Sequence, residues 1–316
     1  MKFTNKHWGL LSSISIIFFQ CLSCNFCVAQ DFPTKPIKII VGSVPGGSPD
    51  FIARALAQSL SDLIKLPVVV ENRPGAGNTT AAIYVGKSVP DGYTLYLGDT
   101  SHQADVVLKD LLPISSITSE PLLLVASNKS GFNSLQDIIR EAKVHPGEIN
   151  FGSSGIGSIH HIAMAAFNHE IGLNVTHVPY KGSGESVPAI LSGDISILMT
   201  SYTATASQIR AGTLKLIAVS SSKRFSKFPN IASMGEFIKD YNYTSETGIL
   251  TTNGVSSSIH LKLISLIKRV SEDSFFVAKF KDTALSINFV PFPEFTQVLK
   301  NELQKYRDVT SLINSQ

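Results

Sequence analysis

Short apolar runs alternate with helical patterns along most of the chain. Ile37 to Val41 predicts a buried strand, the loop GSVPGGSPD follows it, and apolar residues at 3.6-residue spacing then predict a helix. At the start of this helix we expect Ser48 as the N-cap, Pro49 in the first turn and Asp50 at the positive helix end. This order of strand, glycine loop and helix favours an α/β fold with mainly parallel sheets.

The same unit recurs further along the chain. Residues 148–152 and 175–180 predict strands, and each is followed by a polar glycine loop and a helix; the first helix should end near Gly172 and the second covers Val187 to Leu191. Further strands are expected at residues 68–71, 94–97, 122–126, 195–200, 214–220 and 248–251. No Gly/Ser/Pro-rich linker divides the chain. If there are two domains, we expect the chain to cross between them in strands, near residues 122 and 247, and the C-terminal helices to return to the first domain.

The first thirty residues have the layout of an export signal. Lys2 and Lys6 precede an apolar run, and the small residues Cys27 and Ala29 suit cleavage after Ala29. The run is about 12 residues long, whereas a membrane-spanning helix needs roughly 20. We therefore expect residues 1–29 to be a signal peptide and the remaining chain to be periplasmic.

All three cysteines, Cys21, Cys24 and Cys27, lie in this segment. The mature chain would then have neither a disulfide nor a thiolate metal site. Lipidation of Cys21 or Cys24 stays open, because neither has the full pattern of small and aliphatic residues before it.

Composition narrows the choice of function. The chain is 43% hydrophobic and only 16% charged, which excludes a disordered protein. Its net charge is +3, and removing residues 1–29 takes away two lysines and no acidic residue, which leaves 25 basic and 24 acidic residues. This charge is too small to neutralise a row of phosphates, so a nucleic-acid partner is excluded.

Three loops, at residues 45–50, 153–160 and 180–186, share one chemical character. Each follows a predicted strand, opens a helix and is rich in Gly and Ser rather than in Arg or Lys. A helix start presents unpaired N–H donors and about half a positive charge, so such a loop can hold a carboxylate without a basic side chain. Each loop alone could be an ordinary tight turn, but three in one chain favour a binding site.

The enzyme and cofactor signatures are all incomplete. His160 stands where a dinucleotide loop after Gly155 and Gly157 needs its third glycine, Ala81 occupies the first glycine position of a phosphate loop, and no G-x-S-x-G elbow occurs. The histidines lack metal-ligand spacing. His160 and His161 point about 100° apart on a helix, so the simplest interpretation has one lining a cleft and the other solvated. We expect no cofactor, no metal and no catalytic residue.

Eight segments in order carry a family resemblance. They are FPTKPIKIIV, VPGGSPD, VVVENRPGAGN, PDGYTL, FGSSGIGSIHH, HVPYKGS, LIAVSSSKR and FPNIASMGEF. From about Phe32 to the C-terminus the chain resembles the periplasmic substrate-binding proteins of tripartite tricarboxylate transporters, also called the Bug family. The resemblance implies a two-domain type II periplasmic binding-protein fold with a ligand cleft between the domains. It further implies a monomer that captures a small carboxylate or related metabolite and delivers it to membrane permease subunits.

We expect one domain to consist of residues 30–122 and 247–316, and the other of residues 123–246. By the resemblance, ligand contacts in the first domain would be Pro45, Gly46, Gly47, Ser48, Asp50, Thr100, Ser101 and His102. Those in the second domain would be Ser153, Ser154, Gly155, Gly157, Ser158, His160, Tyr180, Lys181 and Gly182, with Thr200 and Ser201 as weaker candidates. Arg73 is expected to pair with Glu71 outside the site.

Several positions depart from the family pattern. Pro49 replaces the usual Thr, Ala189 and Ser196 replace common acidic residues, and the 247–258 segment lacks an aromatic residue and prolines. These changes leave the ligand undetermined. Two alternatives also stay open: a sensory receptor that passes ligand occupancy to a signalling partner, and a secreted hydrolase that uses Ser153 or Ser154 with His160.

Overall fold

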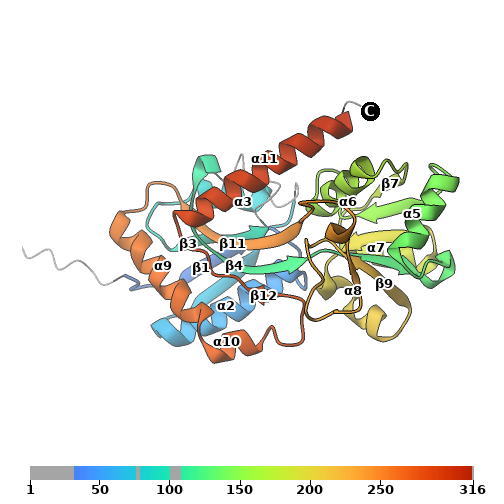
Figure 1. Ribbon diagram of the computed structural model, residues 1–316. Coiled ribbons are helices and arrows are strands. Elements are labelled where there is room, and N and C mark those ends of the chain that lie inside the picture. Colours follow the sequence, from blue (N-terminus) through green and yellow to red (C-terminus); the bar gives the residue numbers. More distant parts are fainter. Residues whose placement is uncertain (1–31, 76–78, 100–107, 315–316) are drawn as a thin grey trace, which may run out of the picture. The chain divides into compact units, whose positions relative to one another are not determined.

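The structure is a computed structural model that describes residues 32–75, 79–99 and 108–314. From Lys35 onward the chain forms one compact unit, which contains two six-stranded sheets (Figure 1). The first sheet has the order β12 (Ser286–Ile287), β4 (Leu111–Pro121), β11 (Thr244–Thr252), β3 (Thr94–Asp99), β1 (Ile37–Val41) and β2 (Val68–Asn72). The second has the order β10 (Ala232–Ser233), β9 (Leu214–Val219), β5 (Leu123–Ser127), β8 (Ile197–Thr200), β6 (Asn150–Ser153) and β7 (Thr176–Pro179).

Both sheets are mixed, so the expectation of mainly parallel sheets is wrong. Strands β2, β1 and β3 are parallel, but β11 runs antiparallel to β3 and β4. In the second sheet β5 runs antiparallel to β8 and β9. The strands β4, β5 and β11 carry the chain directly from one sheet to the other, without the crossover helix that parallel neighbours need.

Helices cover both faces of each sheet. They are α2 (Ser48–Ile64), α3 (Thr79–Gly86), α5 (Leu135–Val144), α6 (Ile159–Glu170), α7 (Ser183–Ser192), α8 (Tyr202–Arg210), α9 (Ser257–Ser271), α10 (Ser274–Ala278) and α11 (Glu294–Asn314), with short 3-10 turns η2 (Asn128–Ser130) and η3 (Met234–Glu236). On the first sheet, α2, α9 and α10 pack together on one side, and α3 and the start of α11 lie on the other (Figure 1).

The alternation of side chains along β5 explains the two cores of the second sheet. Leu124 and Ala126 pack with α5 and α6, whereas Leu123 and Val125 pack with α7 and α8. Successive residues of a strand point to opposite faces, so a continuous apolar run fills both cores.

Ser220, at the end of β9, connects the two places where the chain changes sheets. Its N–H donates to Leu122 O over 3.0 Å, and its hydroxyl accepts from Leu122 N over 2.8 Å. Its carbonyl accepts from Tyr243 N over 3.0 Å, and its hydroxyl donates to Tyr243 O. Since β5 begins at Leu123 and β11 at Thr244, the sheets change close to the expected boundaries; the division into domains 30–122 with 247–316 and 123–246 stays a prediction.

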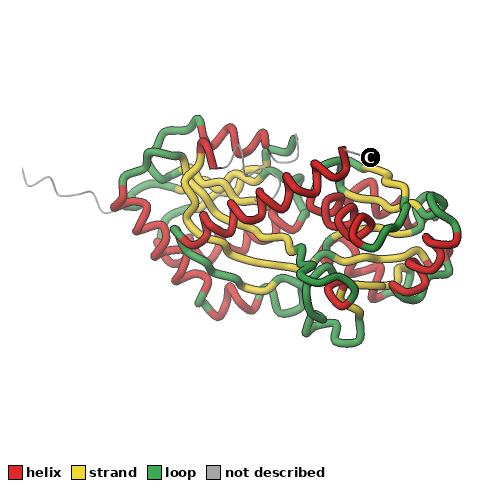
Figure 2. Tube along the Cα trace, turned by 45° about the horizontal axis from the view of Figure 1, so that its top comes forward, coloured by secondary structure: helices red, strands yellow, loops and turns green. Residues whose placement is uncertain are grey.

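Helix α11 belongs to both cores. Phe295 and Leu299 in its first half pack against the first sheet, whereas Val309 in its second half joins the core shared by α5 and α6. Its end runs alongside α6, as the tube in Figure 2 also shows. The C-terminal segment therefore connects the two sheets a third time, after the two strand crossings.

No helix in the described part of the chain is both long and apolar enough to cross a membrane. The expected signal peptide lies outside the described residues.

Candidate functional site

The loop between β1 and α2 contains the first group of expected ligand contacts. Helix α2 has Gly47 as its N-cap, so the expectation of Ser48 is wrong by one residue. The Ser48 hydroxyl instead donates to Glu120 Oε1 over 3.0 Å. Pro45 and Gly46 are exposed, and Gly46 has a φ of +87°, which a side chain would disfavour. This loop therefore presents backbone to its surroundings, while its serine faces the protein.

Asp50 holds this loop from inside. Its carboxylate is 3% exposed and accepts hydrogen bonds from Gly46 N (2.9 Å), Asn72 Nδ2 (2.9 Å) and Arg54 Nε (3.0 Å). Burial alone would raise the pKa of Asp50, but the bonds from Arg54, Gly46 and Asn72 together outweigh it, so the pKa lies below its usual value. Three protein donors thus hold this buried carboxylate in place, which favours a role in shaping the loop over direct ligand contact.

The loop between β6 and α6 contains the second group. Ser153 is fully buried, bonds to His177 Nε2 over 2.7 Å and accepts from Gly155 N over 3.1 Å. Ser158 is the N-cap of α6: its hydroxyl accepts from His161 N over 3.2 Å and donates to Gly155 O over 2.8 Å. Both hydroxyls thus serve the loop itself, in the geometry that the structure describes.

Both backbone groups of Gly157 form hydrogen bonds with side chains. Its N–H donates to His161 Nδ1 over 3.2 Å, and its carbonyl accepts from the Tyr306 hydroxyl of α11. Its φ is +77°, and a Cβ at this position would lie 2.7 Å from Tyr306 Oη. Glycine is required here for backbone conformation and for the close approach of Tyr306.

The two adjacent histidines have different partners, and neither is a solvated side chain. His160 Nδ1 bonds to Ser154 Oγ over 2.7 Å. His161 is 8% exposed and stacks on His177, with ring centroids 4.0 Å apart and planes 14° apart. The expectation that one of the pair is solvated is therefore wrong, because His161 faces the sheet and finds an aromatic neighbour there.

Burial sets the protonation of this histidine pair. It lowers the pKa of His161, and burial together with the charge of His161 lowers the pKa of His177 to about 4. Both rings are therefore neutral at pH 7. Phe151 completes the stack, with its centroid 4.7 Å from that of His177.

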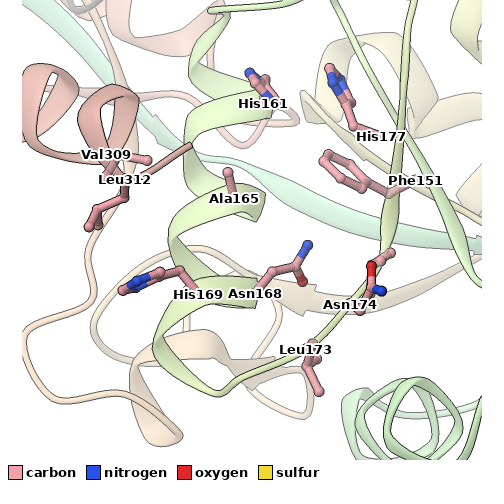
Figure 3. Close-up of a pocket in the computed structure, with 11 residues that line it drawn as sticks. Phe151, His161, Ala165, Asn168, His169, Leu173, Asn174, His177, Val309 and Leu312 are labelled. Atoms are coloured by element: carbon pink, nitrogen blue, oxygen red, sulfur yellow. The ribbon is translucent and has the colours of Figure 1, made fainter. Parts of the chain in front are cut away.

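A cavity of about 170 Å³ lies next to this histidine pair, between α6, the strands β6 and β7 and the end of α11 (Figure 3). It is lined by Phe151, His161, Ala165, Asn168, His169, Leu173, Asn174, Val175, His177, Val309 and Leu312. None of these residues is an expected ligand contact.

The third loop leads from β7 into α7. Tyr180 is half-buried, and its N–H donates to Ser153 O over 3.1 Å, which joins this loop to the second one. Lys181 is exposed, and its N–H donates to Glu185 Oε2 over 3.1 Å. Gly182 is the N-cap of α7, with a φ of +139°. The exposed Lys181 side chain fits the solvated alternative as well as a ligand contact.

The helix starts fall into two classes. Helices α5, α6, α9 and α10 each have an N-cap side chain that accepts a hydrogen bond from the first turn. Helices α2, α7 and α8 have none, and each of these follows a strand directly. Ser201, the N-cap of α8, instead bonds to the Thr203 hydroxyl over 3.1 Å. The uncapped starts keep N–H donors for an anion. Asp50 and Glu185 already place a carboxylate in the first turns of α2 and α7, whereas the first turn of α8 has no acidic residue.

The described contacts bring together the second and third groups of expected residues. The meeting of these groups with residues 45–50 and with Thr200 across a cleft stays a prediction. Thr100, Ser101 and His102 lie outside the described residues. Sequence reasoning missed the support given by Asn72, His161, His177 and Tyr306. The first three lie within the quoted segments VVVENRPGAGN, FGSSGIGSIHH and HVPYKGS, but no local signal points to Tyr306.

Arg73 and Glu71 form the expected pair, with Nε and Oε1 2.7 Å apart. Within the ranges that the structure covers, no group of three or more His, Cys, Asp or Glu side chains could hold a metal ion.

Sequence comparisons identify relatives over most of the chain. Residues 52–314 match the family model of the tripartite tricarboxylate transporter family receptor. Protein BugT of Bordetella pertussis is 37% identical over 219 residues, which cover 66% of this chain and 67% of BugT. A protein encoded in the gbd 5′ region of Cupriavidus necator is 31% identical over 252 residues, or 77% of each chain.

Solved structures agree with this assignment. A periplasmic transporter superposes with a TM-score of 0.79 at 27% identity, covering 89% of this chain and 97% of the other. MatC from Rhodopseudomonas palustris, solved with bound malate, gives a TM-score of 0.76 at 25% identity over 88% of this chain and 99% of MatC. The two mixed sheets, the uncapped helix starts and these matches lead to one conclusion. The chain belongs to the tripartite tricarboxylate transporter receptor family, whose members are periplasmic solute-binding proteins with a two-domain α/β fold.

Proposed function

We propose that the mature chain is a non-enzymatic periplasmic receptor that captures a small carboxylate in a cleft between two domains and delivers it to a tripartite permease. The observation that carries this proposal is the lack of an N-cap side-chain bond at the described starts of α2, α7 and α8, next to capped starts at α5, α6, α9 and α10. An anion near a helix start gains about 0.3–1 kcal/mol from the helix dipole, and more where it is partly buried. The malate bound to MatC is a compound of this class.

Ligand titration tests the class of compound. Isothermal titration or thermal-shift screening of ligand-free protein against malate, other di- and tricarboxylates and aromatic acids should give at least one response. A ligand at 100 times its dissociation constant adds about 2.7 kcal/mol of apparent stability. A complete absence of response to carboxylates would overturn the proposal.

A substitution that caps a helix tests the mechanism. Gly47 has ordinary extended φ and ψ of −74° and 166°, and a Cβ there would meet Ser43 Oγ at a relaxed 3.5 Å. In Gly47→Asp the new carboxylate would cap α2 and occupy the position of a ligand carboxylate. We expect at least tenfold weaker carboxylate binding with stability unchanged or raised, because an N-cap contributes about 0.5–2 kcal/mol.

The control is Ser134→Asp, which replaces one good cap of α5 by another. Its carboxylate affinity should equal that of the unmodified protein. Equal carboxylate affinity in Gly47→Asp would contradict capture by the start of α2.

The hydrolase alternative has one observation in its favour, the 2.7 Å contact between Ser154 Oγ and His160 Nδ1. A serine hydroxyl within reach of a histidine is what nucleophilic catalysis requires. We propose that the pair only fixes the loop, because the chain belongs to a family of receptors. Turnover of p-nitrophenyl acetate that is lost in both Ser154→Ala and His160→Ala would reverse this assignment.

Separate experiments test export to the periplasm and the choice between transport and signalling. Mass spectrometry of protein from the periplasm should show an N-terminus after Ala29, and size-exclusion chromatography should show a monomer. Loss of carboxylate uptake on deletion of the gene supports delivery to a permease, whereas intact uptake with a lost transcriptional response supports a sensory receptor.

A further inference from the structure

The cavity beside α6 is separate from the proposed carboxylate site. Its walls come from α6 between His161 in the first turn and His169 near the end, from β6, from the segment 173–177 and from the end of α11 (Figure 3). The uncapped helix starts belong to α2, α7 and α8, and none of these contributes to the lining. Any molecule held here would be bound by different groups.

Asn168 gives this cavity an unmet hydrogen-bonding group. The side chain is 8% exposed and lines the cavity, where Figure 3 shows it extending from α6 towards Phe151 and Asn174. Its Oδ1 atom is buried and accepts no hydrogen bond from any group that the structure describes. Leaving such an acceptor unpaired costs about 1–3 kcal/mol. A molecule that donates one hydrogen bond to Asn168 would remove this cost.

The other walls select against charge and favour a flat shape. Among the described residues, no Lys, Arg, Asp or Glu lines the cavity. The rings of Phe151, His161 and His177 lie within 26° of parallel. Leu173, Val175, Val309 and Leu312 add an apolar surface, and the polar side chains of His169 and Asn174 also belong to the lining. An ion would lose its hydration here without a counter-charge, whereas a neutral aromatic ring would find both parallel rings and aliphatic contacts.

The volume sets the size of the molecule. An apolar cavity of about 150 Å³ in an engineered protein takes up benzene. The cavity here, at about 170 Å³, has room for one six-membered ring with a small substituent.

We propose that this cavity is a second binding site, for a neutral single aromatic ring that carries an O–H or N–H donor for Asn168 Oδ1. Phenol is the simplest probe of this class, and toluene is its match in size and shape without the donor. Isothermal titration or ligand-observed NMR at millimolar concentrations should detect phenol binding at least fivefold tighter than toluene, the ratio that corresponds to about 1 kcal/mol.

The variant Asn168→Leu separates the hydrogen bond from the cavity. It removes the unpaired amide at nearly constant volume, so the protein should be as stable as before or more stable. Phenol should lose its advantage and toluene should bind equally well or better. Glu170→Gln, an exposed position on the same helix outside the lining, should keep the preference for phenol.

Three results would overturn the proposal: no binding of phenol, a preference for phenol that survives in Asn168→Leu, or crystals soaked in phenol that show only water at Asn168. Competition with malate distinguishes the two sites. Phenol bound in the cavity should leave malate affinity unchanged, and mutual exclusion would place phenol in the carboxylate site instead. If no carboxylate binds at all, the phenol titration still tests the cavity on its own.

Discussion

The two glycine loops that open α2 and α6 are held by opposite kinds of chemistry. The first depends on a buried carboxylate, Asp50, which is bonded to Arg54, Asn72 and the Gly46 N–H. The second depends on neutral groups: His177 holds Ser153, and His161 and Tyr306 grip Gly157. Loops of similar composition can therefore present backbone donors to one ligand and yet respond differently to acid, to mutation and to the rest of the fold.

The largest loss of stability is expected at Gly157 in the β6–α6 loop, where a neighbouring side chain leaves no space for a Cβ atom. Gly157→Ala places a methyl group 2.7 Å from Tyr306 Oη at a φ of +77°. A positive φ costs a residue with a side chain about 1–2 kcal/mol, and overpacking adds about 1–3 kcal/mol. We expect the free energy of unfolding to fall by about 2–5 kcal/mol and carboxylate binding to be lost.

Gly172→Ala is the matched control, because Gly172 has a φ of +65° but no described atom within 4 Å of the place where a Cβ would lie. Urea denaturation should show only the cost of backbone strain, about 1–2 kcal/mol. Equal losses in the two variants would show that Tyr306 does not constrain Gly157.

The next effect tests the ionic support of the first loop. Asp50→Asn keeps the shape but removes the charge that Arg54 and two N–H donors stabilise, and we expect a loss of about 1–3 kcal/mol and weaker carboxylate binding. Asp137→Asn is the control, since Asp137 of α5 makes a similar pair with Arg140 and accepts from the N–H of Asn133, which precedes the helix, far along the chain from the loop. Because this pair is exposed to solvent, its loss should lower stability less than Asp50→Asn does and leave carboxylate binding unchanged.

As the pH is lowered, the β6–α6 loop should lose stability at a higher pH than the β1–α2 loop. The pKa of His177 is about 4 in the folded protein and about 6.5 when unfolded, so between these values the unfolded chain binds a proton that the folded chain does not. Stability therefore falls as pH drops from 6.5 towards 4. The pKa of Asp50 is below its usual 3.8, so the stability that Asp50 supplies is present above that value and is lost only below it.

Stability curves from about pH 7 to about pH 3 check this order. In His177→Gln, whose amide reaches the position of the Nε2 atom that bonds to Ser153 but does not titrate, the decline between pH 6.5 and 4 should be shallower. An identical slope in the variant would place the acid-sensitive group elsewhere.

The smallest effect concerns one hydroxyl. Tyr306→Phe removes the donor to Gly157 O and should cost about 1 kcal/mol, together with a few-fold loss of carboxylate affinity. Tyr241→Phe removes a comparable bond, from the Tyr241 hydroxyl to Ala163 O of the same helix α6 over 2.9 Å. Tyr241→Phe should lower stability by a similar amount without changing carboxylate affinity. If the two variants bind carboxylate equally well, Tyr306 does not shape the site.

Local patterns predicted most of the strands but, among the described helices, only α2, α6 and α7 by position. Residues 37–41 form β1 as expected, because an apolar run between turn residues has one simple interpretation. Strand β4 was not predicted: its sequence LLPISSITSEP is rich in polar residues, and Ser115, Ser116 and Thr118 are nonetheless fully buried in the middle of the first sheet. Helix α8 was also missed, because only Thr205 along it is buried and it has no apolar stripe.

The site was less predictable than the fold. Glycine and serine content marks the loops, but the groups that shape them are distant in sequence: 149 residues separate Tyr306 from Gly157, and 24 separate His177 from Ser153. Nothing in the neighbourhood of Tyr306 signals its contact, and the HVPYKGS segment marks His177 without naming its partner, since both contacts depend on where α11 and β7 lie in the finished fold.

Helix α11 packs in the hydrophobic cores of both sheets, and this has a consequence for biosynthesis and export. Tyr306 leaves the ribosome, and any translocation channel, 149 residues after Gly157, yet its hydroxyl completes the hydrogen bonding of Gly157, and Val309 fills the core under α6. The second loop therefore reaches its final geometry only after residues 306–309 have arrived. Chains that are clipped before residue 306 should be unable to recruit ligand even where every loop residue is present.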